Sequence, residues 1–310
     1  MRTPAGPAAV PTTSPAAAVG AVLLAAVLFG TTGTAQALGP DATTPLGVGA
    51  VRLLVGGLAL LAVLPLLGHR VRDAVALWRT PAGLGAGAFT ALYQVSFFAG
   101  VERAGVALGT LAAIGSGPVL AGLLARFLLG ERPGRAWAAA TALCLVGLTL
   151  LVLEGGSGDA DVVGVLLALI AGLGYAAYTV LAKSMMGRGA ASAPVMAAAF
   201  GLGGLLLAPV LLLQPTAWLA TPGGLVTALY LGLVTTTLAY VLFGRGLAVL
   251  PAGPVTTLVL AEPVVATALG TTVLGERLGL AGALGAGLVL VGLLVQGRGS
   301  SRRRPVASSS

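Results

Sequence analysis

Two charged side chains of this sequence lie deep within long apolar segments. Glu262 is the only acidic residue inside these segments, about eight residues from the start of its own, and Arg52 lies about seven residues into another. An ionised carboxylate in apolar surroundings costs about 3 kcal/mol, so Glu262 needs a cation, a water-filled cavity or a proton. It could also stay protonated and only hydrogen-bond neighbouring helices. Arg52 could neutralise Glu262, bind an anionic ligand group, or extend to the nearest aqueous surface.

Polar aromatic and amide side chains accompany these charges. Tyr93 and Gln94 share one apolar segment, and Tyr240 lies in another segment at nearly the corresponding position of an internal repeat. Such side chains often hydrogen-bond between helices of a bundle, and they can also contact polar ligands. We predict that Glu262, Arg52, Tyr93, Gln94 and Tyr240 bind a substrate or a proton.

Two prolines occupy matching positions in the two halves of the chain. Pro263 directly follows Glu262, and Pro118 has the same place in the first half. A proline within a helix removes one hydrogen-bond donor and frees the carbonyl group four residues earlier. A simple packing kink is one interpretation. The matched pair favours another, in which both prolines are helix breaks or hinges beside the site.

A four-residue phrase occurs twice. Leu129-Gly130-Glu131-Arg132 recurs as Leu274-Gly275-Glu276-Arg277, at an offset of 145 residues (274 minus 129), and the two proline positions share this offset. Two halves of one apolar chain with a common pattern are typical of membrane carriers built from repeats, which place a substrate site between the halves.

Composition defines the class of protein. The 310-residue chain is 57% hydrophobic and 8% charged, with a mean hydropathy of +1.02, whereas soluble domains carry about 25% charged residues. The net charge of +8 lies in short loops and a tail without an aromatic-interleaved basic face, so we expect no nucleic-acid partner. A lone cysteine, Cys144, excludes an intrachain disulfide. The sequence shows no metal-ligand cluster, no nucleophile paired with a base and no nucleotide-binding loop, so we expect neither an enzyme nor a cofactor nor a metal.

The apolar segments have the length of transmembrane helices. A bilayer core of about 30 Å needs about 20 apolar residues in a helix, and helices satisfy their own backbone in lipid. We therefore predict an all-α integral membrane protein with ten transmembrane helices. Their expected ranges are 17–38, 45–67, 81–100, 106–128, 136–153, 162–185, 193–213, 225–243, 254–274 and 280–295.

Basic residues alternate between the connecting loops and predict orientation. Loops on the side of the N-terminus carry most of the arginines, whereas the other side carries only Arg103 and Arg277. The positive-inside rule then places both termini in the cytoplasm, in a multi-pass protein of the cytoplasmic (inner) membrane. Because each repeat has five spans, an odd number, the second five-helix repeat is inverted relative to the first.

The expected domain organisation follows the repeat. We predict a disordered cytoplasmic tail at 1–15, a first repeat at 16–153, a linker at 154–161, a second repeat at 162–296 and a disordered basic cytoplasmic tail at 297–310. The first span could instead be a cleaved signal peptide, but its long start has one basic residue and several prolines. Small residues spaced by four at 134, 138 and 142, and again at 279, 283 and 287, indicate a packing seam or a homodimer contact.

Together these motifs resemble the EamA family of the drug/metabolite transporter (DMT) superfamily. The resemblance rests on Pro118 followed by 129–132, and on Glu262-Pro263-Val264 followed by 274–277. It implies a ten-helix secondary transporter that moves a small metabolite, an amino acid-like compound or a drug, across the bilayer by alternating access. Export is the expected direction, and protons are a candidate coupling ion. A non-transporting membrane scaffold or assembly protein, or a channel, is the alternative.

Overall fold

The computed structural model describes residues 14–41, 43–154, 161–275 and 277–301, and these residues form helices without strands. Ten helices in this part of the chain are long and apolar enough to cross a membrane, which confirms the predicted fold class. Five of these spans lie in the first repeat and five in the second, and several are composites of shorter helices. In the first repeat the spans are α1 (Pro15–Ala37), α2 (Pro45–Val63) continued by η1 (Leu64–Leu67), α4 (Pro81–Ala104), α5 (Val106–Leu129) and α6 (Arg135–Glu154).

In the second repeat the first two spans are α7 (Val162–Gly187) and α8 (Ser192–Leu207), which η2 (Ala208–Leu213) continues. The third span joins α9 (Pro222–Leu229), η4 (Tyr230–Leu238) and α10 (Ala239–Val249), the fourth joins α11 (Ala252–Val259) and α12 (Ala261–Val273), and the fifth is α13 (Leu280–Ser301). Two short helices, α3 (Val71–Leu77) and η3 (Ala217–Ala220), lie in connections.

Several spans begin at the same two-residue signal. A serine or threonine caps the helix by accepting a backbone N–H with its side chain, and a proline then occupies the first helical position, where its missing N–H costs nothing. Four spans follow this pattern, at Ser14-Pro15, Thr44-Pro45, Thr80-Pro81 and Thr221-Pro222.

The repeated Leu-Gly phrase ends a helix in each half. Gly130 terminates α5 with φ of 67°, and Gly275 follows α12 with φ of 73°. This left-handed conformation is open to glycine at little cost and closes the last carbonyls of a helix. The phrase is therefore a helix stop at equivalent places of the two repeats.

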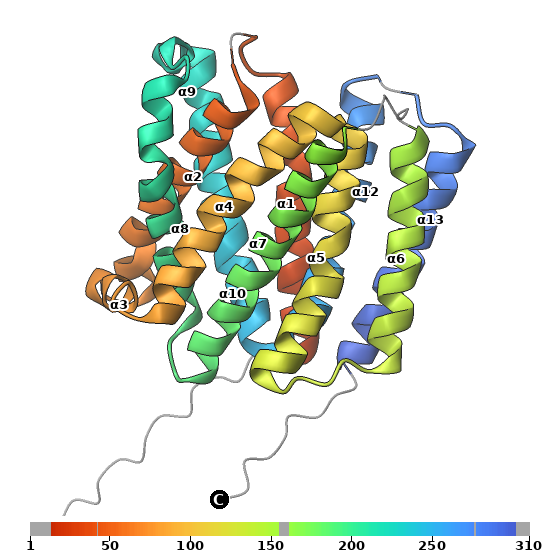
Figure 1. Cartoon of the computed structure of the whole chain (residues 1–310), viewed down its shortest axis with the longest axis horizontal. Helices are drawn as coiled ribbons and strands as arrows, with labels where there is room; N and C mark the ends of the chain where they lie inside the picture. The colour runs from red at the N-terminus through yellow and green to blue at the C-terminus, as the bar shows by residue number, and fades with distance from the viewer. Residues whose placement is uncertain (1–13, 42, 155–160, 276, 302–310) are drawn as a thin grey trace, which may run out of the picture.

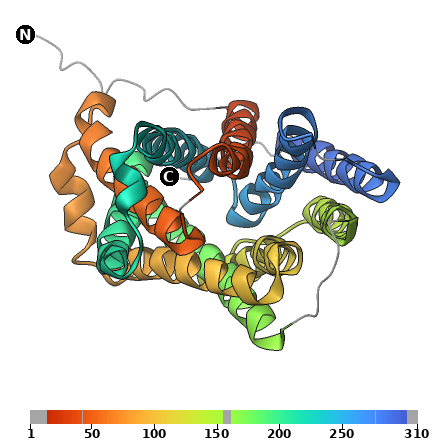
Figure 2. The same ribbon diagram turned by 90° about the horizontal axis from the view of Figure 1, so that it is seen from above.

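Contacts between α6 and α13 show the symmetry of the two repeats. A Cβ atom added to Gly147 would lie 2.5 Å from the Gly285 carbonyl oxygen, and one added to Gly292 would lie 2.8 Å from that of Ala140. At the repeat offset of 145, Gly147 corresponds to Gly292 and Ala140 to Gly285, so the repeat exchanges one contact for the other. The two helices run side by side at one edge of the molecule (Figure 2) and lie antiparallel, which is the packing that inverted repeats produce.

The small-residue spacing noted in the sequence lies on another face of these helices. Ala138 and Ala142 on α6, and Ala283 and Gly287 on α13, are exposed. The seam between the two helices uses Ala140, Gly147, Gly285 and Gly292 instead. A contact with a second copy through the exposed small residues stays a prediction.

Both described ends of the chain lie at one end of the bundle (Figure 1). Gly297 and Gly299 of α13 lie beside Val19 of α1 and Ala136 of α6, respectively. We call this end the basic end and the other the opposite end. The basic end carries the last turns of α13 and exposed arginines at positions 70, 72, 79, 132, 135, 188, 245 and 298. The first repeat begins at the basic end and the second begins at the opposite end, so the repeats are inverted as predicted.

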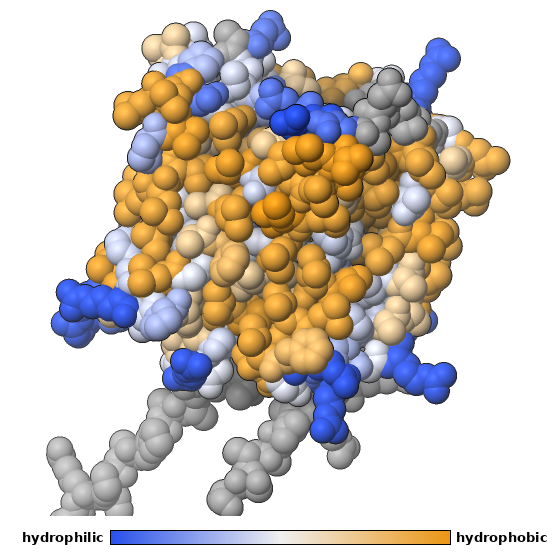
Figure 3. All heavy atoms as spheres, viewed as in Figure 1, coloured by the Kyte–Doolittle hydropathy of each residue, from blue (hydrophilic) through white to orange (hydrophobic). Residues whose placement is uncertain are grey.

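The lateral surface is apolar, and hydrophilic residues gather at the two ends (Figure 3). Large exposed side chains on the spans include Leu24, Leu58, Phe127, Leu166 and Leu290. A continuous apolar surface of this kind suits the hydrocarbon of a bilayer rather than water.

Some sequence expectations lie outside the described residues. They are residues 1–13 of the tail expected at 1–15, residues 155–160 of the linker expected at 154–161, Glu276 of the second repeated phrase, and residues 302–310 of the tail expected at 297–310. The start of that last tail, 297–301, is instead the last turn of α13.

Candidate functional site

The five predicted site residues come from four spans and meet within the bundle. Arg52 lies on α2, Tyr93 and Gln94 lie on α4, Tyr240 lies on α10, and Glu262 lies on α12. The Glu262 carboxyl group is close enough to Arg52, Tyr93 and Tyr240 for direct Coulombic interaction. Gln94 reaches α2 through its amide nitrogen, which packs against Gly49, one turn before Arg52. The structure thus brings all five together, while their part in binding stays a prediction.

Opposite charges in this cluster are held apart. No salt bridge joins Arg52 to Glu262, although both residues belong to the described part of the chain, where Arg72 pairs with Asp73 and Arg103 with Asp161. Both Arg52 and Glu262 are partly accessible rather than fully buried. The two charged side chains are therefore not bonded to one another in this structure.

Three hydrogen-bond donors of the cluster lack partners. Arg52 Nε, Gln94 Nε2 and Tyr175 Oη are buried and make no hydrogen bond in the structure, and Gln94 is only 2% exposed. Buried polar groups are nearly always paired, so each unpaired one needs an explanation. A bound ligand or water with acceptor oxygens would satisfy all three.

A connected row of aromatic rings crosses the cluster. The ring of Tyr240 packs on Phe200 at 3.7 Å and on Phe29 at 4.9 Å between centroids, and Tyr178 contacts Phe200 at 5.5 Å. The row continues through Tyr175 to Tyr93, with centroid distances of 5.5 and 5.9 Å. The Tyr178 hydroxyl donates to the Tyr240 hydroxyl at 3.3 Å. These rings form an apolar wall with hydroxyl groups, which suits an aromatic or aliphatic ligand portion.

The helix that carries Glu262 is interrupted beside it. α11 ends at Val259, Leu260 donates its N–H to the Thr257 carbonyl group at 3.1 Å, and α12 starts at Ala261. Pro263 has no N–H for the Val259 carbonyl group, which explains the break. Glu262 therefore lies in the first turn of a helix, where the helix dipole favours negative charge.

The first-half proline behaves differently. α5 runs continuously from Val106 to Leu129 through Pro118, which is buried. The helix break is therefore present at Pro263 and not at Pro118. A hinge role for either proline stays a prediction.

The span that carries Tyr240 contains a π-helical segment just before this residue, and the segment was not predicted from the sequence. η4 covers Tyr230–Leu238, and the hydroxyl groups of Thr236 and Thr237 bond carbonyl groups five residues earlier, at Leu231 and Gly232, at 2.9 and 3.0 Å. The Thr237 hydroxyl also bonds the Gly56 carbonyl oxygen of α2 at 3.1 Å. π-helical turns often occur at functional sites because they reorient the side chains that follow. The run of three threonines at 235–237 was the only signal of it in the sequence.

Comparisons with known proteins agree with this architecture. The profile of the EamA-like transporter family matches residues 16–153 and 162–297. The chain belongs to the EamA family. Relatives include "Uncharacterized transporter YwfM" of Bacillus subtilis, 44% identical over 88% of this chain and 91% of the relative, and "Uncharacterized transporter" of Archaeoglobus fulgidus, 30% identical over 90% and 95%.

A solved structure, named only "Crystal structure of protein", superposes with a TM-score of 0.77 at 23% identity, over 90% of this chain and 95% of the other. This likeness shows the fold alone. The two matched EamA segments and the named relatives make the chain a multi-pass membrane transporter.

The two EamA repeats pack tightly together at the basic end. Glu131 of the first repeated phrase accepts the Ala252 N–H, at the start of α11, with its Oε2 at 2.9 Å. The hydroxyl groups of Thr141 and Thr257 lie 2.9 Å apart. Gly253 of α11 faces Gly122 of α5, where a Cβ atom added to Gly253 would lie 3.3 Å from the Gly122 Cα atom. The second half of α5 thus closes on α11.

The symmetric packing at the opposite end is not formed to the same extent. Inverted symmetry would pack α12 on the first half of α5. Among the described residues α12 packs mainly on α1 and α13, and α5 is not among its main neighbours. In the EamA bundle α5 therefore packs closely on the other repeat's ninth span at the basic end and much less closely at the opposite end.

Two further contacts hold the bundle ends. Lys183 Nζ donates to the carbonyl oxygens of Leu247 and Ala248 at 2.7 and 3.2 Å, so it caps the end of α10. At the opposite end Arg103 Nε donates to Asp161 Oδ2 at 2.8 Å and ties α4 to the start of α7. The Arg103 hydrogen bond, together with the Val163 N–H, holds the pKa of Asp161 below its usual range.

No group of three or more His, Cys, Asp or Glu side chains in the described part of the chain could hold a metal ion.

Proposed function

We propose that this EamA protein is a secondary transporter for a small zwitterionic metabolite of the amino-acid type. The observation that carries the proposal is the cluster between the repeats, where Arg52 and Glu262 interact without a salt bridge and three donors lack partners. Arg52, Gln94 and Tyr175 would take up a carboxylate, and Glu262 an ammonium group or a proton. The aromatic row would receive the side chain of the metabolite.

Alternating access would move this substrate. The excess of arginine at the basic end supports a cytoplasmic location for that end, and for both termini, in the cytoplasmic membrane. The contacts of Glu131 and Thr141 would then shut the cytoplasmic side, and the looser packing of α12 on α5 would leave the site open to the outside. For export, the substrate would have to enter from the cytoplasm, which requires the opposite conformation with the cytoplasmic contacts open.

Counterflow into proteoliposomes tests the proposal. Vesicles loaded with a mixture of unlabelled amino acids should accumulate a labelled one, whereas vesicles loaded with amines or with carboxylic acids that lack the second charge should not. Exchange of amines alone, or of carboxylic acids alone, would refute the proposal that the substrate is a zwitterion. A lack of exchange with every compound would favour a membrane scaffold or assembly protein.

The direction of transport has to be measured in living cells. Cells that overproduce the protein should release more of the substrate, and cells without it should retain more. Faster uptake on overproduction would contradict export and leave the carrier function intact.

A further inference from the structure

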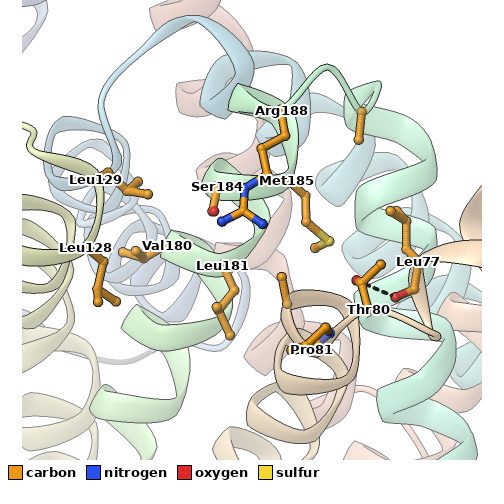
Figure 4. Close-up of a pocket in the computed structure, with 12 residues that line it drawn as sticks. Leu77, Thr80, Pro81, Leu128, Leu129, Val180, Leu181, Ser184, Met185 and Arg188 are labelled. Atoms are coloured by element: carbon orange, nitrogen blue, oxygen red, sulfur yellow. Dashed lines mark hydrogen bonds between the residues drawn. The ribbon is translucent and has the colours of Figure 1, made fainter.

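A second cavity lies away from the central cluster, at the basic end. Its volume is about 520 Å³, and it lies between the start of α4, the end of α5 and the end of α7 (Figure 4). Its lining is apolar except for Thr80, Ser184 and Arg188. None of the five central site residues lines it.

The polar groups of this cavity offer donors to an anion. The Thr80 hydroxyl is occupied, because it donates to the Leu77 carbonyl oxygen at 2.7 Å and accepts the Gly83 N–H at 3.1 Å. Ser184 and Arg188 form no side-chain hydrogen bond or ion pair with other described residues, and Arg188 is exposed. Figure 4 shows the Arg188 guanidinium extending back along α7 toward Ser184. No acidic residue lines the cavity.

Positive charge surrounds the cavity and lipid-facing side chains adjoin it. Arg79 precedes the lining residue Thr80, and Arg126 lies one turn before the lining residue Leu129; both arginines are exposed. Leu128, another lining residue, is 64% exposed, and its neighbour Phe127 is 77% exposed. Exposed apolar side chains on a membrane span face lipid, so the cavity is continuous with the surface that acyl chains cover.

We infer that this cavity binds the headgroup of an anionic phospholipid from the adjacent leaflet. The Arg188 guanidinium would bind the phosphate through two parallel hydrogen bonds, as arginine does with phosphate oxygens, and Ser184 would donate a third. The acyl chains would run over Leu128 and Leu181. Basic pockets between transmembrane helices at the cytoplasmic side are known to suit such headgroups. The inference stands on the cavity alone and does not depend on transport.

A bound lipid would join the two repeats. α4 and α5 belong to the first repeat and α7 to the second. The phosphate would bind at the end of α7 through Ser184 and Arg188, and the acyl chains would pack on Leu128 of α5, so one lipid would stabilise the contact between the repeats at this end.

Native mass spectrometry of the full-length protein tests the inference. The protein is reconstituted with equal amounts of phosphatidylglycerol and phosphatidylcholine that have the same acyl chains, and bound lipid is counted after extraction into detergent. The wild type should retain about fivefold more phosphatidylglycerol, the factor that corresponds to about 1 kcal/mol per basic residue. Arg188→Gln should abolish this preference. Arg245→Gln removes an exposed arginine of the same end that does not line the cavity, and it should keep the preference.

Three outcomes would overturn the inference. The first is equal retention of both lipids by the wild type. The second is an equal effect of the two arginine variants. The third is an absence of lipid preference together with Arg188-dependent binding of millimolar inorganic phosphate or glycerol phosphate, which would assign the cavity to a soluble phosphate compound. Ser184→Ala supplies a milder variant if Arg188→Gln is poorly produced, and it should weaken the preference in part.

Discussion

At the scale of single residues, Glu262 is the proposed carrier of a proton in transport. It lies beside the helix break at Pro263 and interacts with Arg52, so its charge state acts directly on the cluster. Glu262→Gln keeps the size and hydrogen bonding of the side chain but cannot titrate. We expect folding and expression to be retained and proton-driven flux to fall by roughly tenfold or more, the loss that about 1.4 kcal/mol produces.

Flux with and without an imposed pH gradient measures this effect. Glu102→Gln is the matched control, because Glu102 is exposed at the opposite end of the bundle. Full flux with unchanged pH dependence in Glu262→Gln would reduce Glu262 to a helix-packing residue.

Arg52 should discriminate the carboxylate of the substrate. Lysine keeps the charge but lacks the planar fork that binds two oxygens at once. We expect Arg52→Lys to raise the KM for a zwitterionic substrate by about tenfold, and Arg52→Gln to abolish binding. A methyl ester of the same substrate should bind only weakly to the wild type, and both variants should leave this weak binding nearly unchanged. Equal losses for acid and ester would show that Arg52 only supports the fold.

At the scale of helices, the spans were predictable because long apolar runs and Ser/Thr-Pro starts act locally. The fate of the two prolines was not predictable. Pro118 and Pro263 share their sequence context, yet α5 stays continuous and the ninth span breaks at Leu260. Packing differs around them, since α5 is held by α4, α7 and α11 whereas α12 packs on α1 and α13. The packing of Phe29 and Phe200 on Tyr240 was not predicted either. A phenylalanine within an apolar segment gives no sequence signal of which side chains it contacts.

Glu131 should stabilise the closed contact between α5 and α11. Its carboxylate accepts the Ala252 N–H at the start of a helix, where negative charge is favoured. Glu131→Gln keeps an acceptor but loses the charge, worth about 1 kcal/mol, so we expect the closed population to fall about fivefold relative to the open one. Distances between spin labels on α5 and α11 at the basic end would report this shift. An unchanged distribution, with Glu102→Gln as the control, would mean that helix packing alone closes this end.

Asp161 should tie α4 to α7 in a pH-dependent manner. Its pKa is depressed in the folded protein, so the contact with Arg103 stabilises the fold above the ordinary aspartate pKa and is lost as the pH falls through the folded value. Because solvent screens this exposed pair, Asp161→Asn should lower the melting temperature only slightly at neutral pH. The difference from wild type should vanish in acid, in thermal unfolding in detergent. Asp41→Asn is the exposed control at the same end. A loss that persists in acid would contradict the ion pair as its cause.

At the scale of the whole molecule, the structure combines internal symmetry with one asymmetric feature. The contacts of α6 with α13 obey the two-fold relation of the repeats, whereas α5 packs closely on α11 and α12 packs mainly on α1 and α13. Inverted repeats make this asymmetry reversible, because exchanging the conformations of the halves would open the basic end and close the other. Under the proposed alternating access, the symmetry of the repeats would supply the second state of the carrier from the first.

Cysteine labelling in oriented vesicles tests the two states and the orientation together. In a Cys144→Ala background, Phe97→Cys places a thiol on α4 where the Phe97 ring packs on Tyr93, with 5.9 Å between the ring centroids. Thr256→Cys places a thiol in the buried region of α11. With the basic end in the cytoplasm, a membrane-impermeant maleimide added outside should label position 97 and not position 256. Adding Glu131→Gln should expose position 256 to reagent from the cytoplasmic side, because it weakens the contact that covers that region. Labelling of position 97 only from the cytoplasm would invert the proposed topology. Protection of both positions from both sides would instead show that the protein is closed to both sides in the absence of substrate. Substrate binding would then be needed before either side opens.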